Sequence, residues 1–236
     1  MQTKYFSPTL LSVCLASFLA VLWTPAVEAG CYDKRAPGMD WSGCKKTNKM
    51  LDDSDFTGSR FDNAILTLSS LDESKFKGAS LVKADMTRAT ARDAYFEDAD
   101  LTKSVGYRAV FDRATLKNSI MTKSEFFRAS FRGADISDVD WSKSELGRVD
   151  FSAARLDNVS FHFTNLSRVV FADAQLEDVD FYGAYTYLTH FEGVDLSRVK
   201  KLSQLQINLS CGNLETRLPE GRWIPDTWPC VDEQNN

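Results

Sequence analysis

The chain has 236 residues and a formal net charge of -5, and 43% of its residues are hydrophobic while 26% are charged. This balance is typical of a folded globular protein. It excludes a wholly disordered chain, because such chains have too little apolar surface to bury.

The first 29 residues differ from the rest of the chain. A short start containing Lys4 leads into the uncharged apolar stretch "LLSVCLASFLAVLW", and the segment ends at Val27-Glu28-Ala29. This pattern predicts a secretory signal peptide over residues 1–29, cleaved after Ala29. The apolar stretch is shorter than the roughly 20 residues that a spanning helix needs, so a retained membrane anchor is the weaker reading. We therefore expect a periplasmic or secreted protein without a transmembrane span after cleavage.

A lipid anchor is a second alternative for this end of the chain. Lipoprotein precursors are cut just before a cysteine that is then acylated, and Cys31 lies close to the predicted cleavage point. Glu28, however, stands where such signals carry an apolar residue.

Four cysteines remain once Cys14 is removed with the signal, and they can pair in three ways. Cys31 and Cys44 lie near the start of the mature chain, and Cys211 and Cys230 lie near its end. Because no cysteine lies between the two groups, we expect Cys31–Cys44 and Cys211–Cys230, formed in an oxidising compartment. A zinc site is the alternative, although neither pair has CxxC spacing or a nearby histidine.

Residues 30–50 are predicted to form an N-terminal cap held by the first disulfide. The segment "CYDKRAPGMDWSGC" has turn chemistry at Pro37-Gly38. Trp41 lies a multiple of five residues before Leu51, so the cap should lead directly into the element that follows.

A period of five governs residues 51–199. Every fifth residue from Phe56 to Leu196 is Phe, Leu, Met, Ile or Trp, except at Ala91, Gly106 and Thr186. The residue two places before each of these positions is always Ala, Ser, Val or Thr. A step of five turns an α-helix by about 140° and alternates between the faces of a strand, so neither element could bury this set together. A fixed period indicates stacked repeats instead.

A backbone that turns one corner in every five residues would point both repeated positions inward, and four such units would close a square coil. The recurring Ala-Asp-apolar pattern at Ala84-Asp85-Met86, Ala99-Asp100-Leu101 and Ala134-Asp135-Ile136 resembles the pentapeptide-repeat proteins. The resemblance implies an all-β fold, a right-handed quadrilateral β-helix. Residues n and n+20 should then stack, so that Phe111, Phe131, Phe151, Phe171 and Phe191 form one column. Gly106 should mark a narrowing or a bulge.

Residues 200–236 are predicted to be the C-terminal cap and tail, since a stack of coils needs covered ends. Ser203 and Gln206 have capping-box spacing and Gly212 is a stop signal, which predicts a short helix over Ser203–Ser210. The segment "LPEGRWIPDTWPC" should form an irregular lid tied by the second disulfide.

Stacking also predicts two columns of cations at the coil corners. One column contains Arg88, Arg108, Arg128, Arg148 and Arg168, and its neighbour contains Lys83, Lys103, Lys123 and Lys143. Like charges so close together repel each other. Two interpretations stay open: the nearby acids Asp85, Asp100, Glu125, Asp140 and Glu145 screen the columns, or the columns bind a polyanion with the help of Tyr107 and Phe127.

Other motifs do not predict catalysis. The only two histidines, His162 and His190, fall on different columns, and the paired carboxylates lack a cleft that would shift their pKa. We find no phosphate loop, catalytic triad or nucleotide fingerprint, and we expect neither a metal nor a cofactor.

The resulting hypothesis is a non-enzymatic exported scaffold whose flat faces bind a protein or a cell-envelope component, with a second copy of the chain as one candidate partner. Two alternatives are a polyanion-binding module and a mimic of duplex DNA, since some cytoplasmic family members resemble DNA and bind gyrase. The mild net charge, the basic columns and the predicted export argue against the mimic, and we do not expect a nucleic-acid partner. An enzyme is the least favoured class.

Overall fold

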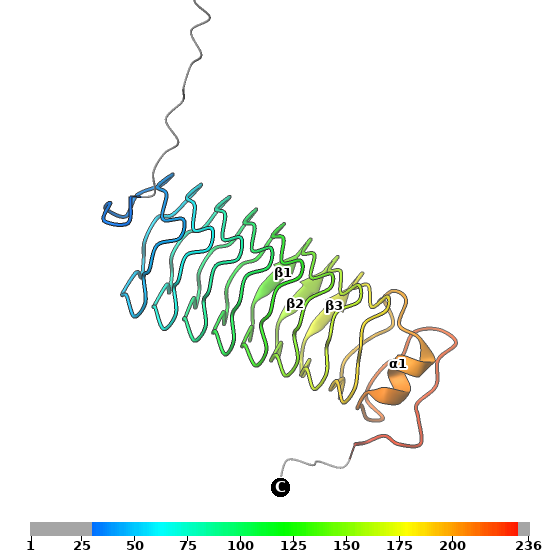
Figure 1. The fold of residues 1–236 in the computed structure, drawn as a ribbon. Coiled ribbons are helices and arrows are strands. Elements are labelled where there is room, and N and C mark those ends of the chain that lie inside the picture. The colour runs from blue at the N-terminus through cyan, green and yellow to red at the C-terminus, as the bar shows by residue number, and fades with distance from the viewer. Residues whose placement is uncertain (1–29, 231–236) are drawn as a thin grey trace, which may run out of the picture.

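The computed structural model describes residues 30–230. The predicted signal peptide over residues 1–29 and the last residues of the tail, 231–236, lie outside the described residues. In the described part, the chain winds as a stack of four-sided coils along one axis, and a helix and an irregular segment cover the far end (Figure 1). This architecture is the predicted right-handed quadrilateral β-helix.

Parallel pairing between residues that are twenty apart holds successive coils together. It starts with Asp40 opposite Arg60 and recurs every five residues, so that each side of the coil carries a ladder. On one side the pairing is long enough to form three short parallel strands, β1 (Asp135–Ser137), β2 (Arg155–Asp157) and β3 (Gln175–Glu177). Backbone hydrogen bonds such as that from Phe131 N to Asp150 O, at 2.8 Å, satisfy the backbone within the stack.

The large residue of each repeat fills the interior of the coils. The rings of Phe131 and Phe151 stack with centroids 5.4 Å apart, and those of Phe151 and Phe171 stack at the same distance. Phe111 and Phe191 extend this column at its two ends. Burial of each large side chain contributes about 1.5–3 kcal/mol, so the stacked columns are the main source of stability. The predicted column is therefore confirmed.

The small residue of each repeat also points inward, where there is room only for Ala, Ser, Thr or Val. Buried hydroxyl groups at these positions bond to the backbone of the preceding coil: Ser74 Oγ donates to Leu51 O at 2.8 Å, and Thr189 Oγ1 donates to Leu166 O at 2.8 Å. These hydroxyl groups are thereby satisfied without water, whereas Ser104 Oγ, Trp41 Nε1 and Trp141 Nε1 are buried without a hydrogen-bond partner among the described residues.

Of the two outcomes predicted for Gly106, a narrowing or a bulge, the bulge is not observed. The ladder passes through this residue without interruption, with Gly106 N donating to Glu125 O at 2.8 Å. The ring of Phe126, one coil further along, occupies the space that a side chain would take, because a Cβ on Gly106 would lie 2.2 Å from Phe126 Cε1. A large neighbour compensates for the missing side chain.

The first coil begins earlier than the predicted boundary at Leu51. Asp40, Lys45 and Met50 already pair with the second coil, and Trp41 is buried in register with the interior columns. The predicted Cys31–Cys44 disulfide is present, with a Cα–Cα distance of 5.5 Å. It ties the segment before Asp40 to the first coil, because Cys44 is itself a buried coil residue.

The helix α1 (Gln204–Leu209) covers the other end of the stack, with Ser203 as its N-cap and the predicted capping box to Gln206. The helix ends at Leu209 with Ser210 as its C-cap, in agreement with the predicted segment Ser203–Ser210. The side-chain amide of Gln206 donates to Phe181 O at 2.8 Å and to Ala184 O at 2.9 Å. It thereby supplies hydrogen bonds that the backbone of a further coil would otherwise donate.

The ladder continues after the helix, beyond the predicted end of the repeats at residue 199. Cys211 pairs with His190 and Arg217 pairs with Asp195. The Cys211–Cys230 disulfide, with a Cα–Cα distance of 5.3 Å, then ties the tail to the last rung. Among residues 30–230, we find no helix that combines the length and the apolar character needed to cross a bilayer.

A substitution at Gly106 tests the compensation by Phe126. Gly106→Ala should lower the free energy of unfolding by about 1–3 kcal/mol, because the ring of Phe126 is packed against Phe111 and Phe131 and cannot move aside. In a Phe126→Leu background the same substitution should become neutral or stabilising, as expected of Gly→Ala in an ordinary conformation. Urea unfolding of the four variants gives both values. Equal destabilisation in both backgrounds would show that the ring does not fill this space.

Candidate functional site

The corners of the coils are positions of left-handed backbone. The second residue after each core residue from Phe56 to Phe191 has a positive φ, for example 60° at Lys103 and 55° at Arg108. Such a turn is closed by a hydrogen bond across the corner, as from Ala109 N to Gly106 O at 3.0 Å. Among the non-glycine residues found with positive φ there is no Val, Ile or Thr, in keeping with the steric cost for β-branched side chains.

Both predicted basic columns occupy such corners. All their members have a positive φ and are exposed: the Lys column is Lys83, Lys103, Lys123 and Lys143, and the Arg column is Arg88, Arg108, Arg128, Arg148 and Arg168. The two columns border the same side of the coil, whose core residues include Met86, Gly106, Phe126 and Leu146. We call this side, with its two columns, the basic face.

No cation of the basic face takes part in an ion pair within residues 30–230. Arginines elsewhere in the stack do: Arg113 lies 2.6 Å from Asp93, Arg92 lies 3.2 Å from Asp72, and Arg155 contacts two aspartates. Rungs are about 4.8 Å apart, at which distance two unit charges repel by roughly 0.9 kcal/mol even in water. The basic face therefore carries repulsion that the protein does not relieve through ion pairs.

The acids expected to screen these columns do not pair with them. The carboxylates of Asp85, Asp100 and Asp140 instead accept hydrogen bonds from the backbone N–H two residues later, at 2.8–2.9 Å. Glu145 accepts a hydrogen bond from the side-chain amide of Asn165 at 2.8 Å. The local Asx-type bonds commit these carboxylates to backbone N–H groups at the start of the corner turns, and none of them forms an ion pair with the cations of the two columns among the described residues.

At the corner diagonally opposite the Arg column, repulsion between stacked like charges is avoided. There acids alternate with amides along the stack, and Asn118 donates to Asp98 at 3.1 Å while Asn158 donates to Asp138 at 2.9 Å. The alternation replaces repulsion between carboxylates with hydrogen bonds. Because the basic columns lack any such alternation, their charge is concentrated on one side of the rod.

Aromatic residues lie beside the Arg column. Tyr107 and Phe127 stack with centroids 5.9 Å apart, and Arg108 and Arg128 lie over their rings at 5.3 and 5.6 Å. Gly147 leaves room for Phe127, since a Cβ there would lie 2.9 Å from the ring. The face thus combines cations that form no ion pair among the described residues with half-buried aromatic rings.

The aromatic surface continues towards the C-terminal end of the basic face. Tyr185 and Tyr187 stack with centroids 6.2 Å apart, and Arg168 lies over Tyr187 at 5.7 Å. These tyrosines were not predicted from the sequence, because the prediction of the face rested only on the columns of corner residues. Both flank the core residue Thr186, and this position in the repeat would have placed them on the basic face.

Each of the two histidines lies beside a carboxylate. His162 Nε2 lies 3.0 Å from Asp180, and His190 Nδ1 lies 3.1 Å from Glu192. Cys211 lies close to His190 and Glu192, but its sulfur is committed to the disulfide and cannot serve as a thiolate ligand.

Comparison with solved structures finds other repeat proteins of low identity. QnrB1, a plasmid-mediated fluoroquinolone resistance protein, is 18% identical over 79% of this chain and 93% of its own, with a TM-score of 0.46. HetL, involved in regulation of heterocyst differentiation in the cyanobacterium Nostoc sp. strain PCC 7120, is 18% identical over 82% of this chain and 92% of its own, with a TM-score of 0.37. A thylakoid-lumen protein of Arabidopsis thaliana is 17% identical over 58% of this chain and 80% of its own, with a TM-score of 0.23.

Among curated proteins, none matches the chain. Family models do match: a pentapeptide repeat region covers residues 124–200, and pentapeptide repeats cover residues 51–88 and 69–105. These matches together span more than half of the chain. The chain therefore belongs to the pentapeptide-repeat family.

Proposed function

We propose that the protein is an exported, non-enzymatic scaffold whose basic face binds a polyanionic component of the cell envelope. The observation that carries this proposal is the absence of any ion pair, within residues 30–230, for the exposed cations of the Lys and Arg columns. A bound polyanion would reduce the repulsion between these cations. This reduction would add to the binding free energy of each contact between a cation and the polyanion.

The shape of the basic face suits an extended ligand better than a compact one. Its cations repeat at about 4.8 Å per rung, so the Arg column runs for about 19 Å along the rod. The stacked rings of Tyr107 and Phe127 lie beside this column and offer flat apolar surfaces. A polymer with regularly spaced phosphate, sulfate or carboxylate groups could contact both columns at once.

A non-catalytic role is supported by the state of the acids. A general acid at neutral pH needs a carboxyl group whose pKa is raised. Here, the hydrogen bond from Arg113 holds the pKa of Asp93 below its usual value, and the hydrogen bond from Ser197 does the same for Asp195. These carboxylates are structural partners of neighbouring donors.

Export is supported by the apolar stretch before Val27 and by the two disulfides at the ends of the rod. Disulfides form and persist in oxidising compartments outside the cytoplasm. A duplex-DNA mimic would present acids rather than cations, so the unpaired Lys and Arg columns count against that alternative.

Charge reversal on the Arg column tests the binding face. Arg108→Glu/Arg128→Glu should abolish retention on a heparin column and binding to vesicles containing phosphatidylglycerol, because two unpaired cations in the middle of the face become anions. The matched control is Lys75→Glu/Lys117→Glu, which makes the same change in net charge on the opposite side of the coil, at lysines without an ion pair among the described residues. Loss of binding in the control, or retained binding in the Arg variant, would contradict the proposal.

The unrelieved repulsion should also be visible in stability. Lys103→Gln/Lys123→Gln should raise the free energy of unfolding by a few tenths of a kcal/mol to about 1 kcal/mol at low ionic strength, and the gain should shrink as salt screens the charges. Arg113→Gln should instead lower stability, since Arg113 is paired with Asp93. Chemical unfolding at low and high NaCl measures both. A destabilised Lys variant would show that these lysines are structural.

A further inference from the structure

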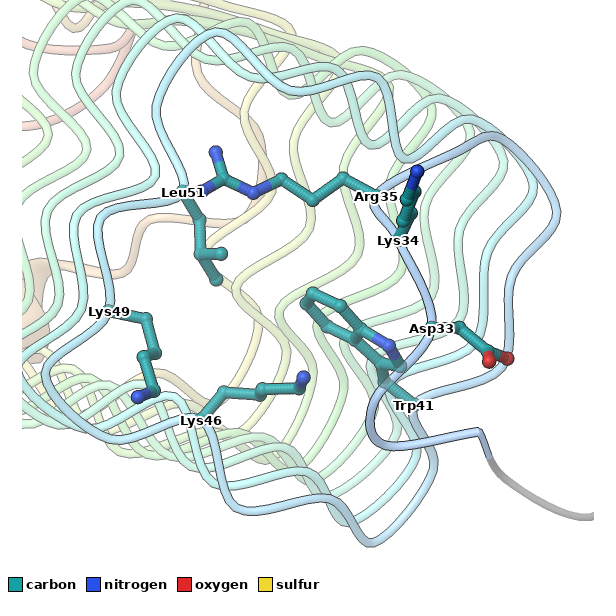
Figure 2. Close-up of a pocket in the computed structure, with 7 residues that line it drawn as sticks. All are labelled: Asp33, Lys34, Arg35, Trp41, Lys46, Lys49 and Leu51. Atoms are coloured by element: carbon teal, nitrogen blue, oxygen red, sulfur yellow. The ribbon is translucent and has the colours of Figure 1, made fainter.

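A pocket of about 480 Å³ opens at the N-terminal end of the stack, far from the capping helix. Figure 2 shows this open end of the first coil, with Trp41 and Leu51 at the centre and Arg35 extending across the opening. The apolar pair forms the floor, and both residues are buried. A volume of this size is within the range of small-molecule sites.

The rim of the pocket is strongly basic. Lys34, Arg35, Lys46 and Lys49 line it, and Asp33 is the one acid among the lining residues. None of these cations forms an ion pair within residues 30–230. The Lys46 ammonium donates to Cys31 O at 2.5 Å and lies 3.5 Å from the centre of the Trp41 ring. Partial burial and the charge of Lys49 lower the pKa of Lys46, and the nearby carboxylate of Asp33 opposes this shift only in part.

The floor of the pocket also contains a buried hydrogen-bond donor without an acceptor. Trp41 Nε1 is buried and, like Trp141 Nε1 inside the stack, has no hydrogen-bond partner among residues 30–230. A buried indole N–H normally finds an acceptor. In Figure 2, Trp41 stands among the basic side chains, so an acceptor bound in the pocket could reach both kinds of donor.

The opposite end of the rod shows that these features are not a general property of a solenoid end. There the indole N–H of Trp228 donates to Ser210 O at 2.7 Å, and the side chain of Gln206 satisfies two backbone carbonyl groups of the last coil. The C-terminal end is therefore closed and its polar groups are paired. Among residues 30–230, the N-terminal end has an open pocket, cations without an ion pair and, at Trp41, an indole N–H without an acceptor.

We propose that this N-terminal pocket binds a small organic anion, with its apolar body on Trp41 and Leu51 and its anionic group among Arg35, Lys46 and Lys49. The apolar floor accounts for the body of the ligand and the basic rim for its charge. The site is separate from the basic face, and it would operate whether or not that face binds a polyanion.

Naphthalene-2-sulfonate is a suitable probe, because it joins a flat apolar body to one anionic group. It should bind the disulfide-bonded protein with a calorimetric 1:1 stoichiometry and should shift the indole ¹H–¹⁵N resonance of Trp41, identified by its loss in Trp41→Phe. Inorganic sulfate, which lacks the apolar body, and 2-naphthylmethanol, which lacks the charge, should each bind at least about tenfold more weakly.

Variants at the rim then test which cations are used. Arg35→Glu/Lys49→Glu should weaken binding of naphthalene-2-sulfonate at least about tenfold, while Lys117→Glu, on the side of the coil away from the basic face, should leave it unchanged. Lys46 is kept, since it holds the backbone of Cys31. Circular dichroism checks that the double variant remains folded.

Three outcomes would overturn the proposal. The first is no binding of naphthalene-2-sulfonate, or unchanged binding in the Arg35→Glu/Lys49→Glu variant. The second is a shift of the Trp141 or Trp228 indole resonance in place of that of Trp41. The third is a dimer in sedimentation experiments that dissociates in the Arg35→Glu/Lys49→Glu variant, which would show that a second copy of the chain covers this end.

Discussion

The pairing of each residue with the one twenty places later is the constraint on which the rest of the structure depends. It places Phe131, Phe151 and Phe171 directly above one another, with centroids 5.4 Å apart, and so builds the interior from stacked rings. The same register repeats every outward side chain at the spacing of a β-ladder, about 4.8 Å. A given type of side chain at one corner, whether apolar, hydrogen-bonding or charged, can therefore recur at the same place in successive coils along the rod.

This multiplication explains why the surface chemistry of the protein is so uneven. Where acids recur, amides alternate with them, as in the Asp98–Asn118 pair, and where arginines recur on other sides they meet aspartates. The Lys and Arg columns have neither arrangement. A folded protein is stable by only about 5–15 kcal/mol, so repulsion that persists through several rungs is a measurable cost. An anionic partner that relieves this cost is the simplest reason for it.

The interior could be predicted from the sequence because the period of five leaves only one way to bury Phe151, Phe161 and Phe171 together. The contacts of the corner residues could not be predicted in this way, because the period fixes the position of each Cα atom but not the direction of its side chain. Asp85 was expected near the cations, yet its carboxylate bonds to the backbone of Thr87. The N-terminal pocket could not be predicted either, because Asp33, Lys34 and Arg35, which complete its lining, belong to the irregular segment before the first coil.

A distance measurement along one corner tests the register most directly. Spin labels at Asn48 and Leu188, which lie on the column of the Arg88 corner, should be separated by about 34 Å, seven rungs of about 4.8 Å each. Labels at Arg88 and Leu188 should be about 24 Å apart, so that the distance shrinks by one rung for every twenty residues removed. Double electron–electron resonance would give both values. Distances that do not follow this linear relation would contradict the stacked register, and with it the basic face.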